Sequence, residues 1–428
     1  LRAMLDPRTL AARRDEVAES CRRRGVAVDL DAVIGHQERV STLQTKLQEV
    51  YRQRNEHQAH GKRPLSVPER EAHAAEGRRL KDEAARLEVG LAEAEKELRV
   101  LAGTIPNLVH PDVPTGGEAD FRELRRSGTP ARFDFGAADH LTLAEKLSLV
   151  DFDGGAKVAG PKFYFLKNEA VLLELALQRF AVDVLMEAGF TPLVTPDVAR
   201  PEILDGIGFD PRGPETQIYS IANEDLCLIG TAEITLGGLY ADTVLDEDAL
   251  PLRLAGLSHC FRTEAGAGGR ESRGLYRVHQ FSKVEMFAIT RPEDSEAMHE
   301  ELVALEEKIY QGLEIPYRVI DVASGDLGAP AYRKFDLEAW MPGRGEGGAW
   351  GEITSASNCT DYQARRLGIR FKRKANKRNE FVHTLNGTAV ALSRAPIAIL
   401  ENHQRADGSI GIPKALQPYL GRDVIGPR

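Results

Sequence analysis

The chain has 428 residues, of which 42% are hydrophobic and 28% charged, and its mean hydropathy is -0.33. This length predicts about two or three domains, and no apolar run approaches the ~20 residues that span a bilayer, so we expect a soluble protein without membrane partners. The formal net charge is -9, so any nucleic-acid-binding surface must be local rather than general.

Cysteine usage and the N-terminal residues indicate a reducing compartment. The four cysteines are scattered and form no CxxC pair, so they offer neither a disulfide framework nor a cysteine zinc site. The first residues, LRAMLDPRTLAARRDEV, lack the apolar segment of a secretory signal. We therefore expect a cytoplasmic protein.

Two stretches with heptad-like apolar spacing predict a helical hairpin. The first apolar stripe runs over residues 33–50 and loses its pattern near Gly61, and the second runs over residues 80–101. Ser66 and Glu69 have capping-box spacing and predict the start of the second helix. Two such helices joined by a short turn predict an antiparallel coiled coil with arms on the order of 50 Å long.

The hairpin has two interpretations. One is a coiled coil that only solubilises or dimerises the protein. The other is a recognition arm, because basic residues with few aromatic neighbours suit contacts with a phosphate backbone and recognition of the shape of a nucleic-acid duplex, rather than stacking on bases. The basic residues of the tip and of the second helix are Arg52, Arg54, Lys62, Arg63, Arg70, Arg78, Arg79, Lys81 and Arg86.

After a proline-rich linker at residues 105–117, the pattern predicts a globular domain. An amphipathic helix at residues 168–188 passes through Gly189 into a strand over residues 190–198, broken by Pro196. Because the strands are grouped without strict βαβ alternation, they favour an α+β fold with an antiparallel sheet. Strands are expected at residues 226–235, 256–262, 276–287, 319–323, 334–341 and 350–358, and residues 381–401 read as a strand passing into a helix.

The hairpin at residues 256–287 is the strongest candidate for a binding site. Its loop, residues 265–274, holds four glycines and two arginines and is expected to be flexible and cationic. A period of two would place Arg277, His279, Phe281, Lys283 and Glu285 on one face of the second strand. Such a face suits a site that grips a phosphate, stacks a flat ring and holds an ammonium.

The polar residues of the expected sheet indicate nucleotidyl transfer. They supply cations for phosphates, carboxylates for Mg²⁺ and for an ammonium, and an aromatic ring for a base. The sequence has no HExxH motif, no P-loop lysine and no nucleophile–base pair of known spacing. The residues are Thr231, Glu233, Arg262, Glu264, Arg277, Phe281, Glu285, Glu352, Ser355, Thr388 and Arg394.

Several ordered motifs resemble those of class II aminoacyl-tRNA synthetases, and specifically the seryl-tRNA synthetase family. Residues 261–285 resemble motif 2, and residues 189–198 resemble motif 1, with Pro196 as its proline. TAE at residues 231–233 resembles the serine-binding motif of the family. GEITSASNCTDYQARRLGIRF resembles its metal- and ATP-binding strand, and HTLNGTAVALSRAPIAILENHQ resembles motif 3. The resemblance runs from about Met4 to Tyr419.

The resemblance implies a fold, two domains with different functions, and a reaction. Residues 1–110 would form a tRNA-binding domain with the coiled-coil arm, and residues 118–428 a catalytic domain with an antiparallel sheet and flanking helices. The enzyme would activate L-serine with ATP to seryl-adenylate, with Mg²⁺ present, and transfer serine to the 3′ end of tRNA(Ser), and also of tRNA(Sec). It would act as a homodimer whose arm contacts tRNA bound to the other subunit.

The resemblance also implies roles for individual residues. The catalytic residues would be Arg262, Glu285 and Arg394, with Arg262 bridging the serine carboxylate and the α-phosphate. Phe281 and Arg394 would stack on the two faces of adenine, and Arg277 would reach the leaving phosphates. Glu352 and Ser355 would hold Mg²⁺. The full ATP site would comprise Arg262, Thr263, Glu264, Arg277, Val278, Phe281, Glu352, Ile353, Thr354, Ser355 and Arg394.

The implied serine site holds the ammonium and hydroxyl of the substrate. It would comprise Thr231, Ala232, Glu233, Arg262, Glu285 and Thr388. By the same resemblance, Arg270 and Glu271 would meet the acceptor end of the tRNA. One departure is Ser393, because the family usually has glycine before the motif 3 arginine, and this side chain would lie near the adenine face.

Two alternative functions are compatible with parts of the sequence. The chain could activate an amino acid for a carrier protein, although such an enzyme has no use for a duplex-reading arm. It could also be a catalytically silent RNA-binding paralogue. Such a copy should have lost Arg262, Glu285 or Glu352, and all three residues are present.

Overall fold

The chain forms two compact units, Leu1–Leu108 and Val109–Arg428. The computed structural model describes residues 7–61, 63–64, 66–209, 217–265 and 274–427. In this described part, no helix is both long enough and apolar enough to cross a lipid bilayer. The four cysteines are all buried and form no disulfide.

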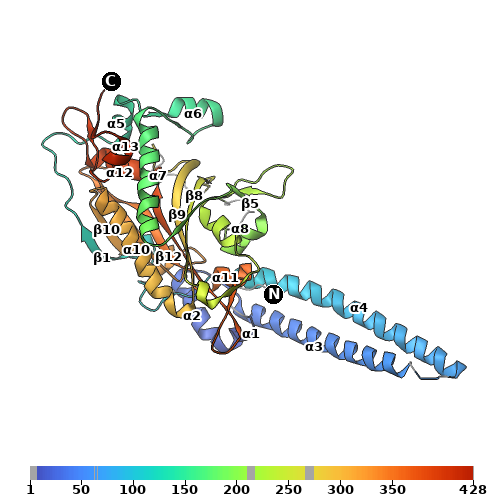
Figure 1. Ribbon diagram of the computed structural model, residues 1–428. Helices are drawn as coiled ribbons and strands as arrows, with labels where there is room; N and C mark the ends of the chain where they lie inside the picture. The colour runs from blue at the N-terminus through green and yellow to red at the C-terminus, as the bar shows by residue number, and fades with distance from the viewer. Residues whose placement is uncertain (1–6, 62, 65, 210–216, 266–273, 428) are drawn as a thin grey trace. The chain divides into compact units, whose positions relative to one another are not determined.

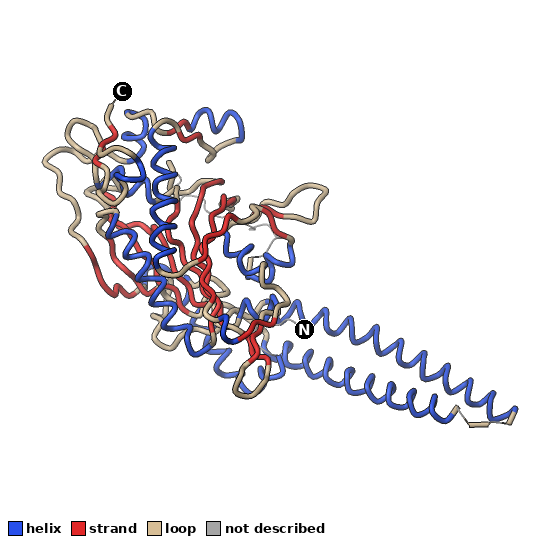
Figure 2. Tube along the Cα trace, in the orientation of Figure 1, coloured by secondary structure: helices blue, strands red, loops and turns tan. Residues whose placement is uncertain are grey.

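The first unit is helical and contains the predicted pair of long helices. Short helices α1 (Pro7–Leu10) and α2 (Arg14–Arg24) precede the long helices α3 (Leu30–His60) and α4 (Val67–Gly103). Figure 2 shows α3 and α4 as two long blue helices running side by side. Apolar residues between the two helices bury one another, and they include Leu47, Val50, Leu80 and Ala84. The predicted hairpin of helices is therefore confirmed.

Polar contacts fix the pairing and the ends of the hairpin. Arg39 of α3 forms a 2.8 Å ion pair with Glu97 of α4, and further along the hairpin the Tyr51 hydroxyl donates to Glu88 at 2.5 Å. The Glu69 carboxylate accepts a hydrogen bond from the Ser66 backbone N–H at 2.7 Å. This is the capping contact predicted for the start of α4.

The second unit is built on an eight-stranded sheet with the strand order β1-β10-β11-β12-β15-β9-β8-β4. Neighbouring strands are antiparallel except β4 and β8, which are parallel. The bounds are β1 (Arg122–Ser127), β4 (Thr191–Val194), β8 (Leu252–Phe261), β9 (Gln280–Thr290), β10 (Tyr317–Asp321), β11 (Arg333–Met341), β12 (Ala349–Asn358) and β15 (His383–Ala391). The expectation of an α+β fold with an antiparallel sheet is confirmed.

Smaller elements surround the sheet. The helices are α5 (His140–Lys146), α6 (Phe152–Ala159), α7 (Glu169–Glu187), α8 (Pro201–Ile207), α9 (Ala232–Gly238), α10 (Ser295–Gly312), α11 (Tyr362–Leu367), α12 (Ala395–Asn402) and α13 (Gln417–Leu420). The short strands pair as β2 (Val150–Asp151) with β3 (Phe165–Leu166), β5 (Val198–Ala199) with β6 (Cys227–Leu228), and β16 (Ile410–Gly411) with β17 (Val424–Ile425). A three-stranded sheet has the order β14 (Asn379–Phe381), β13 (Arg370–Lys372) and β7 (Val244–Asp246).

Helices cover both faces of the large sheet, and β9 shows how its residues divide between them. Figure 1 shows α7 and α10 along one face, with α8 on the opposite side. Val284 and Met286 point into the core shared with α7 and α10, whereas Phe287 and Ile289 point into a second core shared with α8, α9 and α11. Because residues alternate along a strand, Phe281, Lys283 and Glu285 lie on the α9 side.

Two sequence predictions on this side of the sheet were wrong in detail. Residues 226–235 were expected to form one strand, but the strand β6 covers only Cys227–Leu228 and helix α9 starts at Ala232, with Thr231 as its N-cap. The strand expected from residue 276 begins at Gln280, so Arg277 and His279 lie in the segment before it. The flexible loop expected at residues 265–274 lies mostly outside the described residues.

Candidate active site

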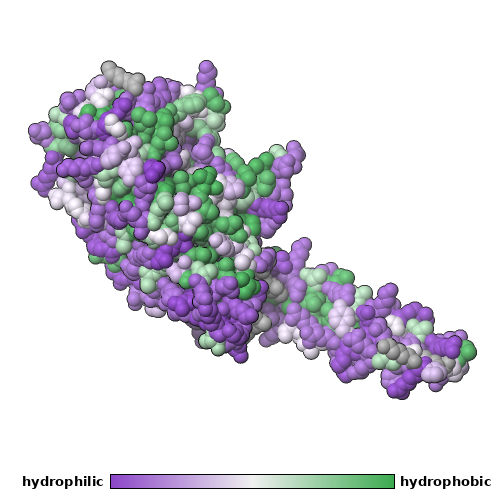
Figure 3. All heavy atoms as spheres, in the orientation of Figure 1, coloured by the Kyte–Doolittle hydropathy of each residue, from purple (hydrophilic) through white to green (hydrophobic). Residues whose placement is uncertain are grey.

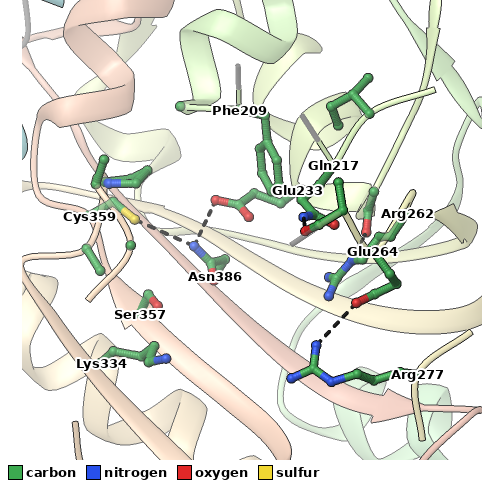
Figure 4. A pocket seen from close by; sticks show the side chains of 18 of the residues that line it. Phe209, Gln217, Glu233, Arg262, Glu264, Arg277, Lys334, Ser357, Cys359 and Asn386 are labelled. Carbon is green, nitrogen blue, oxygen red and sulfur yellow. Dashed lines mark hydrogen bonds and ion pairs between the residues drawn. The ribbon is translucent and has the colours of Figure 1, made fainter. Parts of the chain in front are cut away.

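A cavity of about 860 Å³ opens on the α9 side of the sheet (Figure 4). It merges with a smaller hollow of about 150 Å³, because both are lined by Glu233, Arg262, Glu264, Arg277 and Arg394. The walls come from the start of α9, the ends of β8 and β9, and the central strands β11, β12 and β15. Segments separated by more than a hundred residues therefore meet in one place.

Most of the residues predicted for the site line this cavity. The structure brings together Thr231, Glu233, Arg262, Glu264, Arg277, Val278, Phe281, Glu285, Glu352, Ile353, Thr354, Ser355, Thr388 and Arg394. Ala232 and Thr263 are not among the lining residues; Ala232 is fully buried in the core beneath α9. Arg270 and Glu271 lie outside the described residues.

Arg262, which lines both hollows, makes three contacts with its surroundings. Its Nε donates to the Gly230 carbonyl at 3.2 Å, and its backbone N–H donates to the His279 carbonyl at 3.0 Å. Its guanidinium lies over the Phe281 ring, 5.4 Å from the ring centre. The cation is therefore positioned by backbone and by an aromatic face, and its remaining donors can bind an anion.

Two further arginines of the cavity are each paired with a carboxylate. Arg277 lies 3.2 Å from Glu264. Arg394 forms a 3.1 Å ion pair with Glu352 and stacks on the Tyr276 ring at 4.6 Å. The cavity thus contains three arginines with carboxylates between them, which suits a ligand that carries several negative charges.

Charged neighbours keep Glu352 ionised. Burial alone would raise the pKa of its carboxyl, but the positive charges of Arg394 and Lys334 outweigh burial and lower the pKa below 4.5. Lys334 comes from β11 and was not predicted as a site residue. An ionised carboxylate at this place can hold a cation.

Two β-bulges decide which side chains face the cavity. In β12, Thr354 lies opposite Leu337 and Glu352 opposite Glu338, so Ile353 is an extra residue. Residues three apart normally point to opposite faces of a strand, but the bulge lets Glu352 and Ser355 both line the hollow while Ile353 is buried in the core.

The second bulge lies in β15. Thr388 lies opposite Glu285 and Val390 opposite Val284, so Ala389 is the extra residue. Asn386, Thr388 and Ala391 consequently line the hollow.

The floor of the cavity contains a buried carboxyl that is close to half-ionised at neutral pH. Glu233 Oε1 accepts hydrogen bonds from Gln363 Nε2 at 2.6 Å and from Asn386 Nδ2 at 2.8 Å, the second of which is drawn in Figure 4. Burial, together with the negative charge of Glu285, raises the pKa of Glu233 to about 7. A cationic ligand group would favour the ionised form.

Three residues of this floor were given no role in the sequence analysis. They are Lys283, Gln363 and Asn386, which contact Glu285 or Glu233 directly. The period of two that selected Phe281 and Glu285 also includes Lys283, and Asn386 lies two residues before Thr388. Gln363 lies on α11, and the sequence carries no signal that brings this helix to the site.

Glu352 and Ser355 meet the chemical requirement for a magnesium ion. Mg²⁺ prefers oxygen ligands and is usually held by one or two carboxylates, with substrate phosphates and water completing its shell. An ionised carboxylate and a hydroxyl on one wall of a cationic cavity fit this pattern. Among the described residues, no cluster of three or more histidine, cysteine, aspartate or glutamate side chains could hold a metal without a substrate.

Comparison with known proteins defines the class. The family model of the tRNA synthetase class II core domain (G, H, P, S and T) matches residues 218–403, and the seryl-tRNA synthetase N-terminal domain matches residues 4–109. The first match spans β8, β9, β12 and β15, which carry the cavity. The second unit is a class II aminoacyl-tRNA synthetase core.

Relatives over the whole length define the family. The chain is 56% identical to the serine–tRNA ligase of Rhodopirellula baltica, with 99% of each chain covered, and 53% identical to that of Treponema denticola, with 99% of this chain and 100% of the relative covered. It superposes on the crystal structure of seryl-tRNA synthetase from Pyrococcus horikoshii complexed with ATP with a TM-score of 0.90, at 38% identity, covering 99% of this chain and 100% of that one. The chain belongs to the seryl-tRNA synthetase family.

Proposed function

We propose that this chain is a serine–tRNA ligase that forms seryl-adenylate from serine and ATP and then transfers serine to the 3′ end of tRNA(Ser). The observation that carries this proposal is the convergence of Arg262, Glu285, Glu352 and Arg394 on one cavity. The first step needs cations at the phosphates and a carboxylate at the ammonium, and these four residues supply both. Charging of tRNA(Sec) remains a prediction.

Arg262 is the proposed catalytic cation of the first step. A serine carboxylate oxygen attacks the α-phosphorus of ATP, a P–O bond forms, and the bond to pyrophosphate breaks. Arg262 would bind both the carboxylate and the α-phosphate, and so hold the reacting atoms together and stabilise the charge that builds on the phosphoryl oxygens. Its contacts with Gly230 and Phe281 support a fixed position.

The remaining cationic residues would hold the nucleotide. Phe281 and Arg394 are proposed to stack on the two faces of adenine, and Glu264 with the backbone near Val278 to bind its edge. Arg277 would move from Glu264 to the leaving phosphates. Bound Mg²⁺ would neutralise phosphate charge, and Glu352 and Ser355 are the residues proposed to hold it.

The floor of the cavity would select serine. Glu285 and Glu233 are proposed to bind the ammonium and the hydroxyl, with Thr231 and Thr388 completing the pocket. A buried site that hydrogen-bonds the hydroxyl leaves its polar groups unpaired when alanine binds. Such a site can discriminate between the two amino acids by about 10⁴-fold.

A second copy of the chain is the proposed partner of an exposed apolar surface on the catalytic unit. Helix α7 exposes Val171, Leu172 and Leu175, and Figure 3 shows hydrophobic residues gathering along this face. Strand β4, at the edge of the sheet, leaves Val194 86% exposed. An apolar helix beside an open sheet edge suits a self-complementary interface, and we propose a homodimer.

The coiled-coil hairpin is proposed to bind tRNA. Its outer surface is charged, and several of its arginines are exposed. The cytoplasmic location expected from the sequence stays a prediction.

Serine-dependent ATP–pyrophosphate exchange, followed by transfer of serine to tRNA(Ser), tests the proposal. The wild-type chain should catalyse both steps, and Arg262→Ala should abolish exchange. Absence of exchange with serine would refute the proposed function. Exchange without charging would favour the alternative in which the amino acid goes to a carrier protein.

Removal of residues 31–102 separates the two units of the chain functionally. The shortened chain should retain exchange and lose charging. A matched control replaces only the tip of the hairpin, residues 62–65, with a glycine-serine turn and should leave exchange unchanged. Normal charging by the shortened chain would refute the role of the hairpin.

A further inference from the structure

A buried lysine lies in the floor of the cavity, and the roles assigned so far do not use it. Lys283 follows Phe281 on the cavity face of β9, precedes Glu285 there, and is only 6% exposed. A buried ammonium is costly unless other groups compensate its charge and its hydrogen-bonding capacity. Its partners therefore indicate what it does.

The Lys283 ammonium links two of the groups proposed to bind serine. Its Nζ lies 2.9 Å from Thr231 Oγ1 and 2.5 Å from Glu285 Oε2. Thr231 caps α9, and Glu285 lies on β9. Lys283 thus connects the helix and the sheet from beneath the pocket.

The contact with Lys283 determines what the Thr231 hydroxyl can offer a substrate. A hydroxyl has one proton to donate and two lone pairs that accept. Thr231 Oγ1 accepts from Lys283 and also from the Glu233 backbone N–H at 3.3 Å. Both lone pairs are engaged, so the hydroxyl faces a ligand as a hydrogen-bond donor.

The second contact of Lys283 determines what Glu285 can offer. Glu285 Oε2 forms the ion pair with the Lys283 ammonium and also accepts a hydrogen bond from the Thr388 hydroxyl at 3.2 Å. Both of these contacts are to the same oxygen, so Oε1 is the atom available to a substrate ammonium. Glu285 therefore faces the ligand as an acceptor, in one fixed orientation.

We propose that Lys283 is a positioning residue that sets the donor and acceptor pattern of the amino-acid site without touching the substrate. It makes Thr231 a donor, for a carboxylate or hydroxyl oxygen of serine, and turns Glu285 Oε1 toward the ammonium. The positive charge of Lys283 also offsets the negative charge of Glu285. The site therefore suits a zwitterionic amino acid. The inference rests on the proposed function and deepens it.

The substitution Lys283→Met tests this assignment, because it keeps the length of the side chain and removes its charge and its donors. In ATP–pyrophosphate exchange, the KM for serine should rise at least about tenfold, as expected for the loss of hydrogen bonds to a charged group, whereas the KM for ATP should stay near the wild-type value. Lys308→Met is the control, since Lys308 forms a 3.1 Å ion pair on the surface with Glu187 and should behave as wild type.

A double-mutant cycle with Thr231→Val separates positioning from general damage. If Lys283 acts partly through Thr231, the double variant should be less impaired in serine KM than the product of the two single effects. Two results would overturn the assignment: a Lys283→Met enzyme with wild-type serine KM, or a double variant that shows the full product. A wild-type enzyme inactive with serine would instead refute the proposed function.

A crystal structure of the wild-type enzyme with a sulfamoyl analogue of seryl-adenylate keeps the inference testable if Lys283→Met does not fold. We expect Lys283 Nζ to remain bonded to Thr231 and to Glu285 Oε2, with the substrate ammonium on Oε1. An ammonium that displaces Lys283 from Oε2 would contradict the proposal.

Discussion

The buried carboxyl of Glu233 predicts how serine binding depends on pH. Its pKa in the free pocket is raised to about 7, so it carries a proton below that pH. The serine ammonium favours the ionised form, and binding of serine therefore expels the proton. The KM for serine should fall as pH rises, and it should level off above pH 7.

The size of this effect follows from the pKa. For a group with a pKa of about 7, roughly 9% is ionised at pH 6 and roughly 91% at pH 8. If serine binds the ionised form, kcat/KM for serine should be about tenfold lower at pH 6 than at pH 8. Steady-state exchange at saturating ATP, measured every half pH unit from pH 6 to pH 8, would show this change in kcat/KM as a step.

Glu233→Gln is the control for this titration. A glutamine can still accept the hydrogen bonds from Gln363 and Asn386, but it has no charge to lose. The variant should be impaired relative to wild type at both pH values, most strongly at pH 8, and should lack the step. Any titration of ATP or of serine itself would persist in the variant. A wild-type profile that is flat from pH 6 to 8, or a variant with the same step, would refute the reasoning.

Three further predictions concern the hairpin and the nucleotide site. Arg79 already forms ion pairs of 2.7 Å with Glu76 and Glu83. Joint replacement of the exposed Arg78 and Lys81 by alanine should therefore weaken tRNA binding about tenfold in a filter assay, and Arg79→Ala should weaken it much less. Leu80→Ala should cost the coiled coil about 2–4 kcal/mol, since Leu80 is 2% exposed, and should raise the KM for tRNA without changing exchange. Ser393 lines the hollow beside Arg394 but is only 3% exposed. Ser393→Gly should change the KM for ATP by no more than about twofold; a larger fall would show that the serine side chain obstructs the nucleotide.

The parts of the fold that follow from local patterns could be predicted from the sequence. Heptad spacing and the Ser66–Glu69 cap predicted the helical hairpin. The alternation of Phe281 and Glu285 predicted one wall of the cavity. Residues 226–235 were mistaken for one strand, because a short apolar run before a helix has the same composition as a strand. The N-cap contact of Thr231, which marks the true boundary, depends on backbone geometry.

The rest of the site depends on long-range packing. Gln363 reaches Glu233 because α11 packs near α8 and α9, and no spacing in the sequence reports that contact. The role of Lys283 follows only from its distances to Thr231 and Glu285. Alternation alone would also have placed Glu352 and Thr354 on one face, because a bulge leaves no mark in composition.

The two bulges make the active site depend on how the strands pair as well as on residue identity. Each strand has one extra residue, Ile353 or Ala389. Before that residue the side chains that face the cavity have even numbers, and after it they have odd numbers. With Ser355 held in place, a β12 that kept all its residues but ran without the bulge would turn Glu352 to the face covered by α10, although every proposed ligand would still be present in the sequence. An inventory of matched residues would score such a chain as intact. Judging whether a relative keeps this chemistry therefore requires the pairing register of β12 and β15 as well as the residues that match Glu352, Ser355, Thr388 and Ala391.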